Sequence, residues 1–258
     1  MRKKEIIFWS LIGKKQSMQK NDSHICVVIP TYNERENIAP LVEKIFDLRL
    51  PSVEIVIVDD NSPDGTGKSA DELANKYPLQ VMHREKKAGL GTAYTFAFKK
   101  ILARVPEQKP DYIIQMDADF SHDPLMIPAL LNAAKAHDVV IGSRYVLGGK
   151  IENWDWTRRL LSKWGNRYAR ALLGLPYRDV TSGFKCYRKE VLESIDLNSL
   201  SSVGYNFQIE TIYKAHKKGV RVCEIPITFI ERRAGVSKMN IPIILESFWR
   251  VLVLRLKG

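Results

Sequence analysis

Two pairs of aspartates, each at the end of a strongly apolar run, are the residues of this chain best suited to chemistry. Asp59 and Asp60 follow the run Ile-Val-Ile-Val, and Asp117 and Asp119 follow the run that begins at Tyr112. Apolar runs that stop at turn-forming residues are typical of buried strands. In an open parallel sheet, ligands bind at the carboxyl ends of the strands, and acids placed there are costly unless a cation or hydrogen-bonding ligand receives them. The pattern therefore predicts a metal-assisted enzyme that acts on a nucleotide diphosphate.

The second pair is the predicted metal site. Asp117 and Asp119 would offer oxygen ligands to Mg²⁺ or Mn²⁺, which keeps waters and binds substrate phosphates as well. The alternative for an isolated Asp-x-Asp is a helix cap with a solvated neighbour. We expect His122 to be a turn histidine with satisfied hydrogen bonds rather than a ligand, and Asp123 to cap a helix that starts at Pro124.

The first pair suits the hydroxyls or base edge of a nucleoside, by analogy with acids that bind ribose after a strand. Turn chemistry alone is the alternative, because Asn, Ser, Pro and Gly follow Asp59 and Asp60.

Gly89 opens half of a phosphate loop, but Tyr94 stands where a dinucleotide fingerprint needs its third glycine, and the P-loop lysine is missing. A dehydrogenase or kinase is therefore disfavoured, although Lys86 or Lys87 beside a helix N-terminus would suit a diphosphate.

The elements that must position these residues alternate between strand and helix, which is the signature of a parallel sheet covered on both faces. Strands are expected at 25–30, 54–58, 79–83, 112–116 and 139–142, with amphipathic helices between them. Beyond Gly149 the pattern changes, and we expect an Arg-rich helix at 154–173, a loop and strand at 179–187, a helix at 204–218, a strand at 220–230 interrupted by Pro226, and an apolar helix at 241–256.

Composition narrows the class of partner. The formal net charge of +11 over 258 residues suggests nucleic acid, anionic lipid or phosphorylated small molecules as partners, and a merely well-solvated basic surface is an equal alternative. Cys26, Cys186 and Cys223 stand singly in apolar stretches, which predicts reduced core thiols and a cytosolic protein. The apolar patch from Ile6 to Gly13 is too short to span a bilayer and lacks a cleavage site, so it is either an interfacial anchor or a tail. The 241–256 helix either docks on the core or lies in the membrane interface.

Basic residues near turns dominate the second half. Taken singly, each is better explained as a solvated surface charge. Because arginine forks bind phosphate oxygens bidentately, the set around an acidic metal site predicts a second, anionic substrate. Its members are Arg144, Arg158, Arg159, Arg188, Arg232, Arg233 and Lys238.

These motifs, in this order from about residue 25 to 240, closely resemble dolichyl-phosphate (polyprenyl-phosphate) mannosyltransferases of the family-2 inverting glycosyltransferases. The resemblance is highly specific as an ensemble, whereas the first half alone would indicate only a family-2 transferase. The matching stretches are Val28 to Asn37, Asp59 to Gly65, Gly89 to Ala93, Met116 to Asp119, Gly142 to Tyr145, Thr181 to Phe184, Tyr187 to Leu192 and Gly235 to Lys238.

The resemblance implies a Rossmann-like GT-A fold, a GDP-mannose donor, a divalent cation and a polyprenyl or dolichyl monophosphate acceptor. It implies three domains or segments: an extension at 1–24, a glycosyltransferase domain at 25–240 and an amphipathic C-terminal helix at 241–258. It also implies site roles, residue by residue. Asp117 and Asp119 would bind the metal, and Asp119, Arg144 and Arg158 would be the catalytic residues. The donor would be bound by Pro30, Tyr32, Asn33, Glu34, Asp59, Asp60, Lys86, Gly89, Asp117 and Ala118. The acceptor phosphate would be bound by Arg144, Arg158, Ser162, Arg232 and Lys238.

A phosphate acceptor changes the chemistry that the site must perform. A phosphate monoester is already anionic at neutral pH, so no catalytic base is expected, and the enzyme must position two anions and manage their charge. Two departures from the family bear on this. Some archaeal relatives place a Gln where this chain has Ser121, so the third metal ligand stays open. Some relatives carry C-terminal transmembrane helices, so membrane access here would come from the 241–256 helix, the N-terminal patch or a membrane-anchoring subunit.

Three rival interpretations remain at this point. The first is a polyprenyl-phosphate glucosyl- or N-acetylglucosaminyltransferase that uses a UDP-sugar. The second is a basic nucleic-acid-binding domain, which no recognised module or stacking motif supports, so no nucleic-acid partner is predicted. The third is a regulatory subunit with an inactive transferase fold, against which the complete acidic set argues. We expect a cytosolic enzyme held at the membrane surface, on the plasma membrane of a bacterium or the endoplasmic reticulum of a eukaryote.

Overall fold

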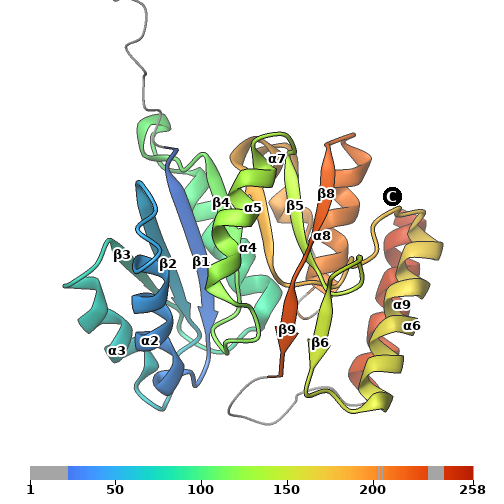
Figure 1. Ribbon diagram of the computed structural model, residues 1–258, viewed down its shortest axis with the longest axis horizontal. Coiled ribbons are helices and arrows are strands. Elements are labelled where there is room, and N and C mark those ends of the chain that lie inside the picture. The colour runs from blue at the N-terminus through green and yellow to red at the C-terminus, as the bar shows by residue number, and fades with distance from the viewer. Residues whose placement is uncertain (1–22, 201, 203, 205, 232–240, 258) are drawn as a thin grey trace, which may run out of the picture.

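The computed structural model describes residues 23–200, 202, 204, 206–231 and 241–257. Its main element is a seven-stranded sheet in the order β3-β2-β1-β4-β7-β5-β8 (Figure 1). The β3, β2, β1 and β4 strands run parallel to one another, as β5 does to β8, whereas β7 is antiparallel to β4 and β5. The mostly parallel α/β sheet is therefore confirmed. The strands are β1 (Ile25–Thr31), β2 (Val53–Asp59), β3 (Leu79–His83), β4 (Tyr112–Gln115), β5 (Val139–Ser143), β7 (Lys185–Arg188) and β8 (Val222–Pro226).

Alternation of side chains along the strands builds two apolar cores, one on each face of the sheet. In β1, Cys26 and Val28 enter one core, and Val27 and Ile29 enter the other. The first core is covered by α4 (Leu90–Leu102), α6 (Trp156–Leu173), α7 (Lys189–Ser194), α8 (Asn206–Lys217) and α9 (Ile241–Lys257). The second is covered by α2 (Arg35–Phe46), α3 (Thr66–Ala74) and α5 (Ile127–Ala134).

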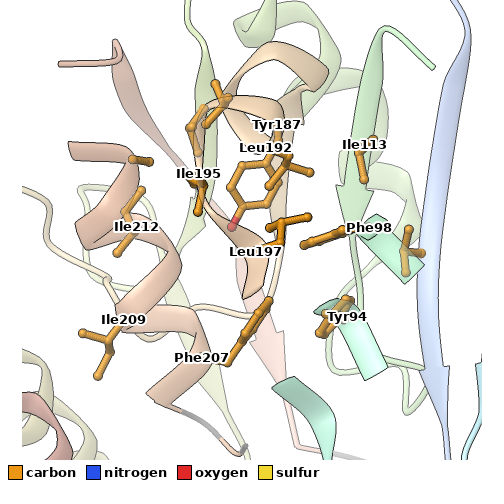
Figure 2. Packing of buried hydrophobic residues seen from close by; sticks show 14 of the residues in the cluster. Tyr94, Phe98, Ile113, Tyr187, Leu192, Ile195, Leu197, Phe207, Ile209 and Ile212 are labelled. Atoms are coloured by element: carbon orange, nitrogen blue, oxygen red, sulfur yellow. The ribbon is translucent and has the colours of Figure 1, made fainter. Parts of the chain in front are cut away.

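An aromatic cluster holds α4 against α8 and β7, as Figure 2 shows. The rings of Tyr94 and Phe207 stack with centroids 5.6 Å apart, and Phe98 lies 6.2 Å from Tyr187 in an edge-on arrangement. At Gly91, α4 approaches α8 and the segment before it so closely that an added Cβ would lie 2.3 Å from the carbonyl oxygen of Ser202 and 2.8 Å from Cβ of Phe207. This packing fixes the N-terminal half of α4, from which Tyr94 reaches the carboxyl edge of the sheet.

The expected strand at 220–230 is in fact two strands in two sheets. β8 belongs to the main sheet, and β9 (Thr228–Ile230) pairs in parallel with β6 (Lys150–Glu152) in a small second sheet. The chain changes sheets at Ile227, whose N–H donates to the carbonyl of Ser143 and whose carbonyl accepts from the N–H of Lys150. Proline lacks a ladder N–H and is tolerated where pairing ends, which explains why β8 stops at Pro226.

α6 and α9 lie side by side beyond the β8 edge of the sheet (Figure 1). The Tyr168 hydroxyl donates to the carbonyl oxygen of Phe248 at 3.2 Å, and Val251 is buried in the first core. Of the two alternatives for the C-terminal helix, docking on the core or lying in the membrane interface, the contacts of α9 match docking on the core. The three-part division at 1–24, 25–240 and 241–258 stays a prediction, and nearly all of the first part lies outside the described residues.

Cysteine usage and the remaining short helices agree with the sequence. Cys26, Cys186 and Cys223 are free thiols, with the first two fully buried and Cys223 partly so. Asp123 accepts a hydrogen bond from the N–H of Leu125 at 3.1 Å and caps a short 3₁₀ turn, η2 (Pro124–Met126), that leads into α5. The predicted capping role is confirmed. Two more 3₁₀ turns are η1 (Pro106–Gln108) and η3 (Leu197–Ser199).

Candidate active site

The predicted acidic residues meet at one edge of the sheet. Thr31 at the end of β1 is paired with Asp59 at the end of β2, and β4 ends at Gln115, two residues before Asp117. Because these strands are parallel neighbours, their carboxyl ends lie at the same edge. Arg144 follows β5, which runs in the same direction as β4 because both are antiparallel to β7.

Asp59 is held by its own turn and by the neighbouring strand β1. Its Oδ1 accepts from the hydroxyls of Thr31 at 3.0 Å and Ser62 at 2.6 Å, and its Oδ2 accepts from the Ser62 N–H at 3.0 Å. The residue is 3% exposed. These contacts favour the turn-chemistry alternative for this carboxylate, and its contact with a nucleoside stays a prediction.

Asp60 organises the glycine loop that precedes α4. Its Oδ2 accepts from the N–H groups of Ala88 at 3.2 Å and Gly89 at 3.4 Å, and its Oδ1 lies 2.8 Å from Nη1 of Arg84. Gly89 adopts φ of 101°, a conformation that side chains rarely tolerate, which lets the chain turn sharply into the helix. The two backbone hydrogen bonds and the largely buried ion pair thus join Asp60 to the loop at 84–89.

The turn after β1 forms the rim of the same region. Asn33 donates its N–H to the Ser62 hydroxyl at 3.1 Å, and Glu34 donates its N–H to the Thr66 hydroxyl at 2.9 Å. The ammonium of Lys87 lies 3.8 Å from the centroid of the Tyr32 ring, whereas Lys86 is exposed. Pro30 lies near the end of β1, and Ala118, between the two predicted metal acids, is buried.

Asp117 and Asp119 are placed differently from one another. Asp119 is 8% exposed, and its Oδ1 accepts from the Ser121 N–H at 3.1 Å. The Asp117 side chain is 30% exposed, and its Oδ1 lies 3.3 Å from the Tyr94 hydroxyl, which also donates to the Met116 carbonyl at 3.0 Å. Burial, together with Asp117, raises the pKa of Tyr94, so the phenol keeps its proton and donates it.

The donor atoms suit a hard divalent cation. Within the part of the chain that the structure describes, no group of three or more His, Cys, Asp or Glu residues forms a protein-only cage. Two carboxylates with open positions for waters and substrate phosphates are how Mg²⁺ is commonly held, and carboxylate oxygens suit Mn²⁺ equally. The hydroxyl of Ser121, two residues beyond Asp119, is buried and has no hydrogen-bond partner among the described residues.

His122 binds the backbone of the acidic pair. Its Nδ1 accepts from the Asp117 N–H at 3.1 Å, and its ring stacks on Phe184 with centroids 5.1 Å apart. Burial lowers its pKa to about 4, so the ring is neutral and carries its proton on Nε2. The expected local hydrogen bond of a turn histidine is confirmed at Nδ1.

Arg144 is the centre of a buried polar cluster. Its Nε and Nη2 each lie 2.7 Å from a carboxylate oxygen of Asp179, and its N–H donates to the same carboxylate at 3.0 Å. Nη2 also donates to the Thr181 hydroxyl at 2.7 Å, and Asn166 donates to that hydroxyl at 2.9 Å. Burial would raise the pKa of Asp179, but the Arg144 guanidinium outweighs it and the pKa is lowered. Both residues are therefore charged at neutral pH.

The second predicted acceptor arginine lies on α6. Arg158 pairs with Glu231, and its guanidinium carbon is 4.3 Å from the centroid of the Trp154 ring. Ser162, one helical turn further, accepts a hydrogen bond from the Tyr145 hydroxyl at 2.7 Å. Arg232 and Lys238 lie outside the described residues.

Several residues of this edge were missed by reasoning from the sequence. Asp179, Asn166 and Tyr94 were given no role, although Asp179 is completely buried and holds Arg144. Thr181 was noticed only as part of a matching stretch. The only available signal for Asp179 was its place just before that stretch, because its burial and its partner Arg144 cannot be read from the neighbouring residues.

Comparison with solved structures defines the class of protein by its fold. Glucosyl-3-phosphoglycerate synthase from Mycobacterium tuberculosis, in a complex with Mn²⁺, UDP and glucosyl-3-phosphoglycerate, superposes with a TM-score of 0.65 and 18% identity over 91% of this chain and 79% of that one. The same enzyme with Mg²⁺ and UDP gives a TM-score of 0.64 at 18% identity, with the same coverage. The fold is the GT-A glycosyltransferase fold, and these structural neighbours hold Mn²⁺ or Mg²⁺.

Sequence comparison then identifies the family. The model of glycosyl transferase family 2 matches residues 26–196. Polyprenol monophosphomannose synthase of Mycolicibacterium smegmatis is 48% identical over 95% of this chain and 92% of its own length. Undecaprenyl-phosphate mannosyltransferase of Micrococcus luteus is 42% identical over 86% and 90%, and dolichol-phosphate mannosyltransferase of Pyrococcus furiosus is 42% identical over 84% and 59%. The chain belongs to glycosyltransferase family 2 and, within it, to the polyprenyl-phosphate mannosyltransferases.

Proposed function

We propose that this protein transfers mannose from GDP-mannose to a polyprenyl or dolichyl monophosphate, with inversion at the sugar carbon, and releases GDP. The observation that carries the proposal is the meeting of an acidic pair and a buried arginine at one sheet edge. The segment from Asp179 to Gly183 contacts both, since Thr181 binds Arg144 and a Cβ added at Gly183 would lie 3.2 Å from Oδ2 of Asp117. A donor diphosphate and an acceptor phosphate could thus be bound as neighbours.

On the donor side, Asp117 and Asp119 would hold Mg²⁺ or Mn²⁺, with the Ser121 hydroxyl available beside them. When bound, the cation would neutralise charge on the departing GDP, a contribution worth several kcal/mol for a Lewis acid. The hydrogen bond from Tyr94 and the backbone contact with His122 orient Asp117 for this task. The turns around Asp59 and Asp60, the Tyr32 to Glu34 rim and the 86–89 loop would surround the nucleoside and diphosphate.

On the acceptor side, the phosphate is itself the nucleophile, so the protein must attract an anion toward another anion. Arg144 would keep its contact with Asp179 and add a phosphate contact. Arg158 would exchange Glu231 for phosphate, because this ion pair is partly exposed. The Nε of Arg158 and the indole N–H of Trp154 are buried without hydrogen-bond partners in the described structure, which favours an anionic ligand between them. Arg232 and Lys238 are proposed acceptor residues on the resemblance alone.

α6 also offers a surface for the lipid. Trp156, Leu160 and Trp164 recur every four residues and are 74%, 48% and 60% exposed, so they form one outer stripe of the helix. The exposed basic residues Arg159, Lys163 and Arg167 form the neighbouring stripe. Aromatic and basic residues on one helix face are typical of interfacial membrane binding.

Peripheral attachment of the protein to the cytosolic face of a membrane follows as part of the proposal. No helix in the described part of the chain is long and apolar enough to cross a bilayer. The α6 stripe adds to the sites expected from the sequence, namely the N-terminal patch, the C-terminal helix and a membrane-anchoring subunit. Arg158 and Ser162 occupy the side of α6 opposite the tryptophans, so the phosphate site and the lipid surface share one helix.

One transfer assay tests the proposed function. Radiolabelled GDP-mannose is incubated with polyprenyl phosphates of different length, with Mn²⁺ or with EDTA, and the lipid product is extracted and counted. UDP-glucose and UDP-N-acetylglucosamine serve as competing donors. Asp119→Ala should lower turnover about 100-fold or more, because a preorganised charge contact is lost. Asp71→Ala, at an exposed ion pair with His83, is the control. Transfer only from a UDP-sugar, or undiminished transfer in EDTA, would refute the proposal.

A further inference from the structure

Lys185 is a completely buried lysine that the proposed mechanism does not use. It is the first residue of β7, where it lies opposite Gln115 of β4 and Ile141 of β5. Burying an ammonium is costly unless hydrogen-bond acceptors surround it, so such a residue needs a structural or functional reason. Among the described residues, no carboxylate forms an ion pair with Lys185 within 4.0 Å.

The ammonium instead holds two neutral segments together. Its Nζ lies 2.6 Å from the Ser182 carbonyl oxygen, 2.7 Å from Oε1 of Gln208 and 3.4 Å from the Gln208 carbonyl. These three acceptors match the three donors of a lysine ammonium. Gln208 in turn accepts from Nε2 of Gln115 at 2.6 Å. The network therefore joins β4, α8 and the segment that enters β7.

The anchored segment touches both halves of the proposed site. On one side, Asp179 and Thr181 bind the Arg144 guanidinium at 2.7 Å. On the other side, Gly183 follows Ser182 directly, and a Cβ added to it would lie 3.0 Å from the His122 ring and 3.2 Å from Oδ2 of Asp117. A shift of the Ser182 carbonyl would consequently move the wall against which Asp117 rests.

We propose that Lys185 is a positioning residue that, through Ser182, fixes the segment Asp179–Lys185 and so sets the spacing between the acidic pair and Arg144. This inference rests on the proposed function, because the spacing matters only where a metal-bound diphosphate and an acceptor phosphate meet. Burial lowers the pKa of Lys185 to about 7, which Asp179 and Asp117 oppose and Arg144 reinforces.

The test uses the full-length protein with three substitutions. Lys185→Met removes the donors and keeps the length, Gln208→Met removes the side-chain acceptor and leaves the lysine, and Lys185→Arg keeps charge and donors. Lys217→Met on the exposed face of α8 is the matched control. The mannose-transfer assay gives kcat and the KM of each substrate. Calorimetric titration with GDP, with and without Mn²⁺, reports the metal-dependent part of nucleotide affinity without any turnover.

Lys185→Met and Gln208→Met should each lower kcat about 100-fold, the loss expected when reacting groups are misplaced by about 1 Å. Both should also weaken the Mn²⁺-dependent gain in GDP affinity, while GDP affinity without Mn²⁺ stays as in the wild type. Lys185→Arg should recover most of both losses. A general packing defect would not spare metal-free GDP binding and would not be rescued by arginine.

The inference is overturned if Lys185→Met folds and retains wild-type kcat and Mn²⁺ dependence. If Lys185→Met does not fold, Gln208→Met decides, and wild-type behaviour of that variant overturns the inference equally. Failure of the wild-type protein to transfer mannose would instead refute the proposed function, so the two failures are distinguishable.

Discussion

The buried pair of Arg144 and Asp179 gives the sharpest prediction, because the chain contains its own surface control. Asp179→Asn removes the negative charge and places an amide N–H₂ among groups that all donate to Asp179, from Arg144, Asn166 and Thr181. Arg221 binds Asp138 through the same three groups, N–H, Nε and Nη2, but its side chain is 64% exposed. Asp138→Asn therefore makes the same substitution in an ion pair that is exposed to solvent.

The expected magnitudes differ because burial differs. Removing one partner of a buried ion pair costs about 3–5 kcal/mol, since the other charge stays uncompensated. An exposed pair is worth about 0–1 kcal/mol. Asp179→Asn should therefore lower the melting temperature by roughly 6–20 °C in a domain of this size, and Asp138→Asn by about 4 °C at most. In the double variant Arg144→Met/Asp179→Asn, the two losses should fall short of additivity by about 0.5–3 kcal/mol.

Urea unfolding at several pH values measures these quantities. The pKa of Asp179 is lower in the folded protein than in the unfolded chain, where an aspartate has a pKa of about 4. The pair therefore contributes its full stabilisation above that pH, and the contribution is lost as the pH falls through the pKa of Asp179 in the folded protein. The difference between wild type and Asp179→Asn should thus shrink in acid. Equal losses for Asp179→Asn and Asp138→Asn, or additive losses in the double variant, would refute the assignment of Arg144 to a buried charge cluster.

Three further predictions concern the acidic pair, the membrane surface and the buried lysine. Gly183→Ala should lower turnover about tenfold or more with little loss of stability, because its Cβ would displace the Asp117 carboxylate. Trp156→Ala combined with Trp164→Ala should weaken cosedimentation with anionic vesicles about tenfold or more, since two exposed indoles are lost. Since the folded pKa of Lys185 is about 7, wild type should gain unfolding free energy over Lys185→Met as the pH rises from about 7 to about 10.

Each of these has a control on the same chain. Gly165→Ala adds a methyl group where no atom lies within 4 Å, and unchanged turnover in both glycine variants would contradict the contact with Asp117. Leu125→Ala removes an exposed apolar side chain away from α6, and an equal loss of vesicle binding there would argue against a specific surface. For the lysine, Lys217→Met should run parallel to wild type, and a Lys185→Met curve that does the same would show that the buried proton is not released.

The local part of the site could be predicted from the sequence. An apolar run that stops at acidic residues marks both the end of a buried strand and the turn beyond it, so the placement of Asp59 and Asp117 needed no tertiary information. The same holds for the cap at Asp123, where the signal lies within two residues of the group it serves.

Contacts between residues that are distant in the sequence could not be predicted in this way. Arg144 and Asp179 are 35 residues apart, and no periodicity links them. Tyr94 was interpreted as a departure from a dinucleotide fingerprint, because its place in sequence says nothing of the Asp117 carboxylate 23 residues away. The division of 220–230 between two sheets depends on a bond between Ile227 and Ser143, which is again non-local. Such contacts follow from the packing of elements, which the sequence pattern specifies only by class.

The orientation of β7 explains why these distant residues meet. In the parallel strands β4 and β5, the site edge is where each strand ends, so only residues that follow a strand can reach it. β7 runs in the opposite direction between them, and the residues that precede it, Asp179 to Phe184, therefore arrive at the same edge. Asp179 and Thr181 bind Arg144, which follows β5, and Gly183 lies beside Asp117, which follows β4. If β7 ran parallel to the other strands, the residues that precede it would lie at the opposite edge of the sheet. The reversal of β7 is therefore what allows one short segment to contact both the donor half and the acceptor half of the proposed site.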